Sequence, residues 1–160
     1  MTKLKDYVEM KIPAKPEFIG VVRLTLSGIA SRMGFTYDDI EDLKIAISEA
    51  CTNAVKHAYQ HEQNGDIVIG FGMYDHKLEV MVADNGKSFD FQKIKEELGP
   101  YSPSVPVEDL NEGGLGLFLI ETLMDEVKVQ MNKGVTVLMT KFLNGERMDV
   151  DTIISESNSN

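Results

Sequence analysis

Residues 49–57 read EACTNAVKH, and this stretch decides how the chain is expected to fold. Glu49, Asn53 and His57 recur at every fourth position, so on a helix they lie along one edge with about 40° of drift per step. A carboxylate and an amide one turn apart present a proton acceptor and a hard oxygen ligand to the same small volume. The stretch therefore predicts a core helix with a polar site along its edge. An ordinary solvated edge would use the same residue types.

Residues before this stretch predict that it belongs to a long helix and that a second helix precedes it. Thr36 and Asp39 form a capping-box pattern at the start of the long helix, which is expected to end near Tyr59. The preceding helix is expected between Pro16 and Gly34, because proline near the start and glycine past the end are typical helix boundaries. The two helices therefore follow one another with a short connection.

Alternating polar and apolar residues predict strands on both sides of these helices. Residues 7–12 are expected to form an edge or first strand. Residues 67–73 and 78–82, separated by a turn, favour an antiparallel hairpin. After a short helix at 89–98 and a loop at 99–106, a helix is expected at about 115–125 and two closing strands at 127–131 and 135–139. The strands thus come in adjacent hairpins.

This order of elements, β-α-α-β-β-(α)-loop-α-β-β, favours an α+β fold: a two-layer α/β sandwich with a mostly antiparallel sheet and helices on one face. A doubly wound Rossmann-type sheet is less favoured, since no Gly-x-Gly-x-x-Gly follows the first strand and no Gly-Lys-Ser/Thr phosphate loop is present. The length of 160 residues fits a single domain, expected over residues 1–145, with a flexible polar tail at 146–160.

Charge and cysteine content exclude several classes of function. The net charge of −10 argues against a nucleic-acid-binding protein, which needs a basic face to displace counterions from phosphates. The single cysteine, Cys51, falls within the apolar pattern and is expected to be a buried, inert thiol in a reducing compartment. No segment has the apolar length of a signal peptide or a membrane span. The sequence therefore predicts a cytoplasmic protein that binds neither nucleic acid nor a membrane.

Two glycine-containing motifs follow the helices. Asp84-Asn85-Gly86 stands at the expected end of a strand, where an aspartate can accept a hydrogen bond from an exocyclic amine such as adenine N6. Gly86 would let a planar ring approach the backbone, although a plain turn uses the same residues. Residues 112–117 read EGGLGL and lead into a helix, so backbone N–H groups there can point at phosphates. Close packing at Gly116 is the other interpretation of that run.

In this order the motifs resemble those of the GHKL ATPase superfamily, which includes gyrase-type ATPases, sensor histidine kinases and MutL. The resemblance covers roughly residues 7–142, with Gly134-Val135-Thr136 in a late strand. Within the superfamily the chain is most similar to the bacterial anti-sigma-factor serine-protein kinases of the RsbW type, on residues 45–59, 112–117 and 121–127. The resemblance implies the GHKL (Bergerat) fold, with an ATP pocket between the helices and the sheet.

The resemblance also implies a role for each matching residue. Glu49 is expected to be the catalytic general base that takes the proton from a serine hydroxyl, and Asn53 to hold Mg²⁺ through its amide oxygen. Asp84 is expected to recognise adenine, with Gly86 and Thr136 at the same end of the pocket. Residues 99–112 would be the lid, and its hinge and phosphate-binding turn are expected at Gly113, Gly114 and Gly116.

The chain departs from the family pattern in two places. Ser88 replaces the second glycine of the adenine motif, and Asn111-Glu112 stands before the lid glycines where close relatives can have a basic residue. The cation that steadies the γ-phosphate is therefore unassigned, with Lys56 and Lys133 as candidates. His57 is expected to be structural rather than catalytic or metal-binding, because no other His or Cys lies at zinc-site spacing from it.

The implied function is that of a homodimeric anti-sigma factor and protein serine kinase. It would bind and inhibit a sigma factor of the sigma-B type and use Mg-ATP to phosphorylate a serine of its anti-anti-sigma antagonist. The alternative is a nucleotide-sensing anti-sigma binding module without phosphoryl transfer. The presence of Glu49 favours the kinase, because a binding module has no use for a base.

Overall fold

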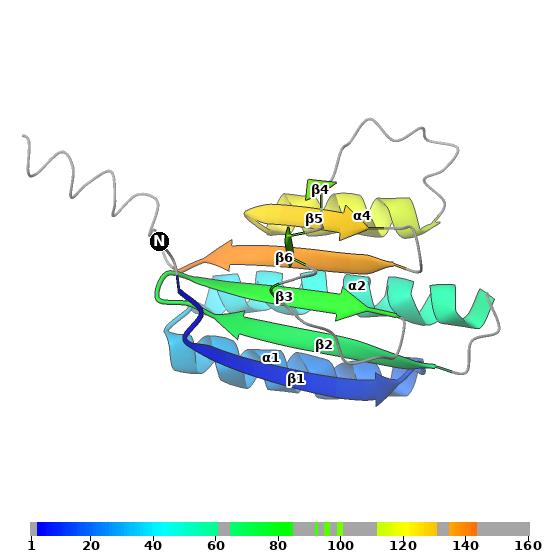
Figure 1. Cartoon of the computed structure of the whole chain (residues 1–160), viewed down its shortest axis with the longest axis horizontal. Coiled ribbons are helices and arrows are strands. Elements are labelled where there is room, and N and C mark those ends of the chain that lie inside the picture. Colours follow the sequence, from blue (N-terminus) through cyan, green and yellow to red (C-terminus); the bar gives the residue numbers. More distant parts are fainter. Residues whose placement is uncertain are drawn as a thin grey trace, which may run out of the picture.

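The computed structural model describes residues 3–60, 65–84, 92, 95–96, 99–100, 112–130 and 135–143, and these form a sheet covered by helices (Figure 1). Six strands lie in the order β1-β2-β3-β6-β5-β4, and every neighbouring pair is antiparallel. The mostly antiparallel sheet predicted from the sequence is therefore confirmed. The strands are β1 (Asp6–Pro13), β2 (Asp66–Met73), β3 (Lys77–Ala83), β4 (Gly99–Pro100), β5 (Glu126–Gln130) and β6 (Thr136–Phe142).

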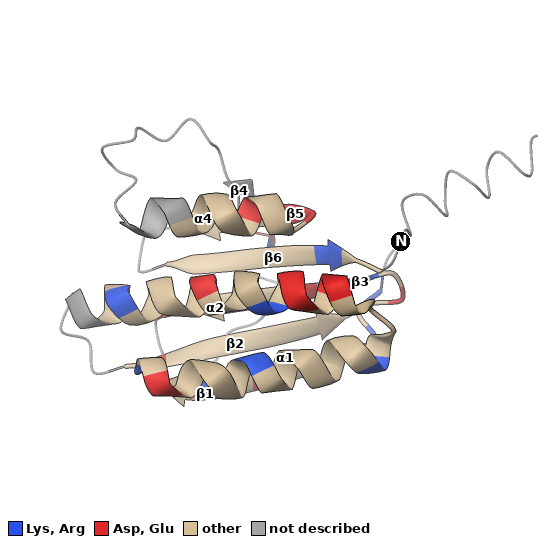
Figure 2. Cartoon of the chain, turned by 180° about the vertical axis from the view of Figure 1, so that it is seen from behind, with Lys and Arg blue, Asp and Glu red and all other residues tan. Residues whose placement is uncertain are grey.

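The helices η1 (Pro16–Phe18), α1 (Ile19–Met33), α2 (Tyr37–Gln60) and α4 (Glu112–Leu123) form the second layer. Figure 2 shows α1, α2 and α4 side by side on one face of the sheet, with α2 in the middle and in contact with both neighbours. The predicted α+β sandwich with helices on one face is confirmed. This arrangement gives each edge of α2 a neighbouring helix, and the edge toward α4 is the one that matters for the site.

Local sequence signals explain where the two long helices begin and end. Gly34 follows α1 in the left-handed conformation (φ 97°), and its N–H reaches the carbonyl oxygens of Ala30 and Ser31. Glycine adopts this conformation without the steric cost that a Cβ would add. The Asp39 N–H donates to Thr36 Oγ1 at 3.2 Å, which satisfies one of the unpaired donors at the start of α2. Both boundaries agree with the sequence prediction.

The hydrophobic core lies between the sheet and the helices. The predicted apolar stripe of α2 faces it, with Leu43, Ile47, Ala50, Cys51 and Ala54 all buried. On the sheet side the core is made by alternate residues of β2, β3 and β6: Ile67, Ile69, Phe71, Leu78, Val80, Val82, Val137 and Met139. Burial raises the pKa of the Cys51 thiol to about 12, so its reactive thiolate form is suppressed, as expected of an inert cysteine.

The structure corrects two element boundaries. Helix α4 begins at Glu112 rather than near residue 115, so Gly113 and Gly114 lie in its first turn. Glycines have poor helix propensity and the apolar pattern starts only at Leu115, which is why the sequence places the start too late. Gly99–Pro100, predicted to be loop, pair with β5 as β4 at the edge of the sheet, where a proline without an N–H is tolerated.

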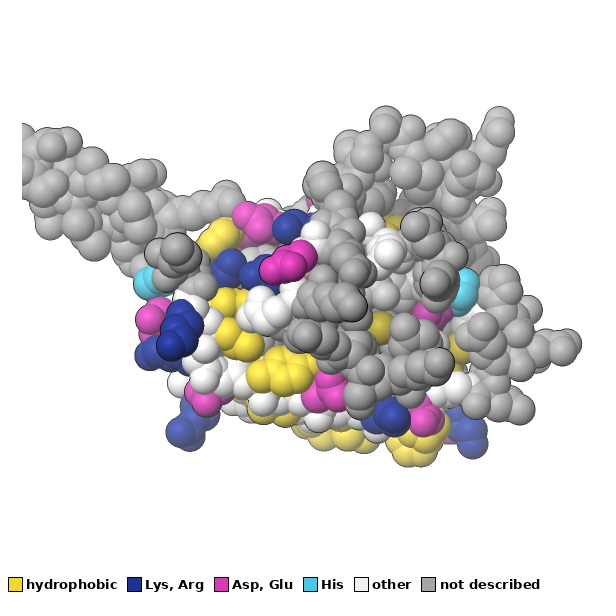
Figure 3. Space-filling model, viewed as in Figure 1, with side chains coloured by type: hydrophobic (Ala, Val, Ile, Leu, Met, Phe, Trp, Pro, Cys, Tyr) yellow, Lys and Arg dark blue, Asp and Glu magenta, His cyan; other side chains and the backbone are white. Residues whose placement is uncertain are grey.

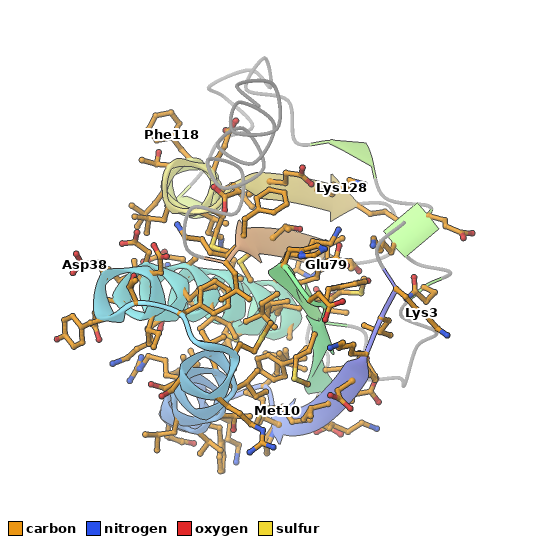
Figure 4. The ribbon with its side chains drawn as sticks, turned by 90° about the vertical axis from the view of Figure 1, so that its left-hand side faces the viewer. Lys3, Met10, Asp38, Glu79, Phe118 and Lys128 are labelled. Carbon is orange, nitrogen blue, oxygen red and sulfur yellow. The ribbon has the colours of Figure 1, made fainter. Side chains whose placement is uncertain are left out.

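The other face of the sheet carries a buried ion pair that was not predicted. Glu79 points away from the helices (Figure 4), and only 2% of the residue is exposed. Lys95 Nζ donates to Glu79 Oε1 at 2.8 Å and to the Tyr74 hydroxyl at 3.2 Å. Of the helix predicted at 89–98, the described residues Gln92, Lys95 and Glu96 are helical. Lys95 therefore attaches the chain that follows β3 to the outer face of the sheet.

Acidic, basic and hydrophobic side chains are interspersed on the face of the molecule seen in Figure 3. Among the described side chains visible there, no broad basic patch of the kind that binds nucleic acid is seen. The helices in the described part of the chain include none that is long and apolar enough to cross a bilayer.

Candidate functional site

The polar edge of α2 meets α4 at Gly116. A methyl group on Gly116 would lie 3.0 Å from Asn53 Nδ2 and 3.1 Å from Glu49 Oε2, with Asn53 Oδ1 at 3.4 Å. Glu49 and Asn53 are half-buried, whereas their apolar neighbours on α2 are fully buried. The absence of a side chain at Gly116 is what lets a carboxylate and an amide approach the α4 backbone together. The structure thus brings three predicted site residues to one point.

The first turn of α4 lies beside this point. Gly113 and Gly114 belong to that turn, and the first four N–H groups of a helix have no acceptor within it. These N–H groups and the helix dipole make the start of α4 favourable for an anion. The predicted phosphate-binding run is therefore a helix start, with its glycines at 113 and 114 ahead of the contact at Gly116.

Asp84 lies at the end of β3, as predicted, and is 3% exposed. Its Oδ1 accepts a hydrogen bond from the Val135 N–H at 2.9 Å, and its own N–H donates to the Val135 carbonyl at 3.3 Å. Its Oδ2 contacts Nδ1 of His57, in the last turn of α2. This contact is not predicted from the sequence, although His57 continues the Glu49–Asn53 edge by one more turn. Asp84 is therefore held by two elements that are distant in sequence.

Thr136 lies at the same end of the sheet as Asp84, because it pairs with Ala83 in the β3–β6 register. Val137 belongs to the core on the helix side, so alternation along β6 turns Thr136 toward the opposite face. Val135 packs against the core and is the residue at this end that faces the helices. The Thr136 side chain thus faces away from the helices. Thr136 would contribute to a pocket between the helices and the sheet only through its backbone or from the edge of the sheet.

The structure describes few of the remaining predicted site residues. Gly86, Ser88, Asn111 and Lys133 lie outside the described residues, as does most of the predicted lid. Lys56 lies on the exposed side of α2.

The donor set at the α2 edge bears on how a metal could be held. Within the residues that the structure describes, no three His, Cys, Asp or Glu side chains are grouped to hold a metal ion. The carboxylate and amide oxygens of the α2 edge fit Mg²⁺, which usually keeps several waters and takes few protein ligands beside substrate phosphates. The amide oxygen of Asn53 is suited to be one such ligand.

Known proteins resemble this chain in both sequence and fold. The sequence model of the histidine kinase-like ATPase domain matches residues 12–141. A serine-protein kinase RsbW from Bacillus velezensis is 64% identical over 160 residues, which are 100% of both chains. The RsbW of Bacillus subtilis (strain 168) is 64% identical over 155 residues, 97% of each chain. The crystal structure of the RsbU and RsbW domains of a Mycobacterium tuberculosis protein has a TM-score of 0.61 at 23% identity, over 87% of this chain and 33% of that one. The latter likeness concerns the fold.

Proposed function

Because the chain belongs to the histidine kinase-like ATPase domain family, among the RsbW serine-protein kinases, we propose that it is an anti-sigma factor that uses Mg-ATP to phosphorylate a serine of its protein antagonist. Membership of this ATPase family implies ATP binding. The observation that carries the proposal is the meeting of Glu49, Asn53 and Gly116, since it combines a base, a metal ligand and a close backbone approach.

The adenine end of the nucleotide is assigned to the Asp84 carboxylate. A carboxylate held by the Val135 N–H keeps lone pairs with which it can accept the exocyclic amine of adenine. The triphosphate end is assigned to the start of α4, where N–H groups that have no acceptor within the helix can bind an anion.

Phosphoryl transfer is assigned to the α2 edge. The serine Oγ of the antagonist attacks the γ-phosphorus, the bond from that phosphorus to the β–γ bridging oxygen breaks, and ADP leaves. The Glu49 carboxylate accepts the serine proton, which removes positive charge from the attacking oxygen as the new bond forms. Mg²⁺, when bound through Asn53, would neutralise phosphate charge. Gly116 keeps both side chains against α4, where the phosphates are expected.

The partners follow from the same family. We assign a sigma factor of the sigma-B type as the inhibited partner, an anti-anti-sigma protein as the phosphorylated one, and a second copy of the chain as the dimer partner. The family match over residues 12–141 supports one kinase domain within residues 1–145. We place the reaction in the cytoplasm, because ATP and transcription factors meet there.

A phosphoryl-transfer assay tests the catalytic assignment. The protein, its antagonist and Mg-ATP labelled in the γ-phosphate are mixed, and label on the antagonist serine is measured. Glu49→Gln is expected to slow transfer by at least about 100-fold, the usual contribution of a positioned base. The matched control is Glu41→Gln, the same change on the same helix at a carboxylate that pairs with Lys44. A Glu49→Gln rate equal to that of the control would remove Glu49 from the mechanism.

The same assay separates the kinase from the alternative, a nucleotide-sensing binding module. A module without transfer would still bind ATP and inhibit transcription by the sigma factor, yet it would leave the antagonist unlabelled. Asn53→Ala tests the metal ligand separately. We expect it to abolish the rise in melting temperature that Mg-ATP produces in the unmodified protein. An unchanged rise would show that Asn53 does not hold the metal.

A further inference from the structure

The contact between His57 and Asp84 has no part in the function proposed so far. Both His57 Nδ1 and Asp84 Oδ2 are buried from solvent, although 26% of the His57 side chain is exposed at another part of the ring. A neutral imidazole has one N–H donor and one acceptor nitrogen, and only a protonated nitrogen is stable against a carboxylate oxygen. His57 is therefore placed to present an N–H at Nδ1 to the Asp84 carboxylate.

Two fixed donors thus hold the Asp84 carboxylate, one on each oxygen. The Val135 N–H, just before β6, holds Oδ1, and His57, at the end of α2, holds Oδ2. The donors come from the sheet and the helix layer, so together they fix the plane of the carboxylate. Each oxygen keeps a further lone pair in a defined direction. A carboxylate held in this way is pre-organised to accept a hydrogen bond from a ligand amine.

We propose that His57 is a positioning residue for the nucleotide base and thereby a determinant of adenine over guanine. This inference rests on the proposed function, in which Asp84 receives the adenine amine. Adenine presents an N–H₂ donor at C6, whereas guanine presents a carbonyl acceptor there. A rigid carboxylate binds the donor and repels the acceptor, but a carboxylate free to turn away discriminates less well.

The place of His57 on α2 supports this role. His57 is eight residues from Glu49 on one edge of the helix, a distance of about 12 Å along the axis at 1.5 Å per residue. A single rigid helix therefore carries the proposed base for the phosphoryl end and the positioning residue for the purine end. Their separation is set by helix geometry and not by loops.

The test compares His57→Phe with His57→Asn in ATP and GTP titrations and steady-state kinetics. Phenylalanine keeps a ring of similar volume without a donor, whereas the side-chain N–H₂ of asparagine takes the place of Nδ1. We expect His57→Phe to raise the KM and Kd for ATP by about 10-fold, the value of one hydrogen bond to a charged group, with kcat nearly unchanged. The preference for ATP over GTP should fall by a similar factor, and His57→Asn should restore most of both.

Several results would overturn the inference. One is a His57→Phe variant with the unmodified KM for ATP and the unmodified ATP/GTP preference. A second is a loss of kcat at constant KM, which would place His57 in the transfer step. If His57→Phe does not fold, a folded His57→Asn variant with an ATP/GTP preference lowered about 10-fold would also refute it.

Asp84→Asn separates this inference from the proposed function. If that change leaves the KM for ATP unaltered while serine transfer continues, the base-positioning role falls and the kinase assignment stands. If the unmodified protein binds ATP with Asp84-dependent affinity but never labels a serine, the kinase assignment falls and the His57 measurement still decides the positioning role.

Discussion

Gly116→Ala is the substitution that tests the geometry of the site most directly. The added methyl group would lie 3.0 Å from Asn53 Nδ2 and 3.1 Å from Glu49 Oε2, closer than ordinary van der Waals contact. Both side chains must therefore move by a few tenths of an ångström. A misplacement of 1 Å at a reacting group costs about 100-fold in rate, so a shift of this size should slow phosphoryl transfer by about 3- to 10-fold.

The effect of Gly116→Ala on stability should be small or favourable. Alanine in place of a helical glycine stabilises a protein by about 0.5–1 kcal/mol, and the displacement of two polar side chains offsets part of that gain. A slower enzyme with an unchanged or slightly higher melting temperature is the expected result. This combination distinguishes a displaced site from a damaged fold.

Gly28→Ala is the matched control, because Gly28 is also within a helix and a methyl group there would meet nothing within 4 Å. It should gain about 0.5–1 kcal/mol, which for a chain of this size raises the melting temperature by about 1–4 °C, without loss of ATP affinity or transfer. The assays are thermal unfolding, ATP titration and serine labelling. If Gly116→Ala matches Gly28→Ala in all three, Glu49 and Asn53 do not act at the α4 contact.

Three further predictions concern stability and reactivity. Lys141→Met should lower the free energy of unfolding in urea by about 1–3 kcal/mol, because Lys141 Nζ donates to the Leu123 carbonyl at the end of α4; an unchanged midpoint would contradict this. Thr36→Ala should cost about 1 kcal/mol through loss of the α2 cap, and Thr36→Ser should recover most of it; equal losses in both variants would argue against the cap. Cys51 should react with a thiol reagent at pH 8 only after denaturation, since burial raises its pKa to about 12. The unfolded thiol ionises near its ordinary pKa of 9.0, so this group's contribution to stability is complete below pH 9 and is lost as the pH rises toward 12; an alkaline unfolding profile identical to that of Cys51→Ala would refute this.

The elements that the sequence predicts well are those with a local periodic pattern. The α2 stripe and the β2–β3 hairpin repeat at helical and strand periods, and the caps at Gly34 and Thr36 depend on residues within one turn. The predicted start of α4 was wrong because the first turn of this helix is glycine-rich. That turn owes its helical form to the position of the whole helix against α2. Helix propensities, which are local, do not include that packing.

The contacts that the sequence does not predict join residues far apart in the chain. Glu79 looks like one more polar residue on a strand, and only the structure shows that Lys95 neutralises it on the outer face. In the same way, the strand alternation that the sequence does show becomes informative for Thr136 only once the helices are placed on one face. The sequence predicts a structural role for His57, but its partner Asp84 lies across the fold and has no periodic relation to it.

The seam between β3 and β6 has a consequence for how the protein is made. Asp84 and Val135 are 51 residues apart, so their pairing closes a long loop and is among the costly, non-local steps of folding. During synthesis β1, β2, β3 and α2 leave the ribosome well before β6. A nascent chain with only those elements has the Glu49–Asn53 edge, but its Asp84 lacks the hydrogen bond from the Val135 N–H. Nucleotide affinity therefore develops late, and ATP should act by slowing unfolding of the finished protein rather than by speeding its folding.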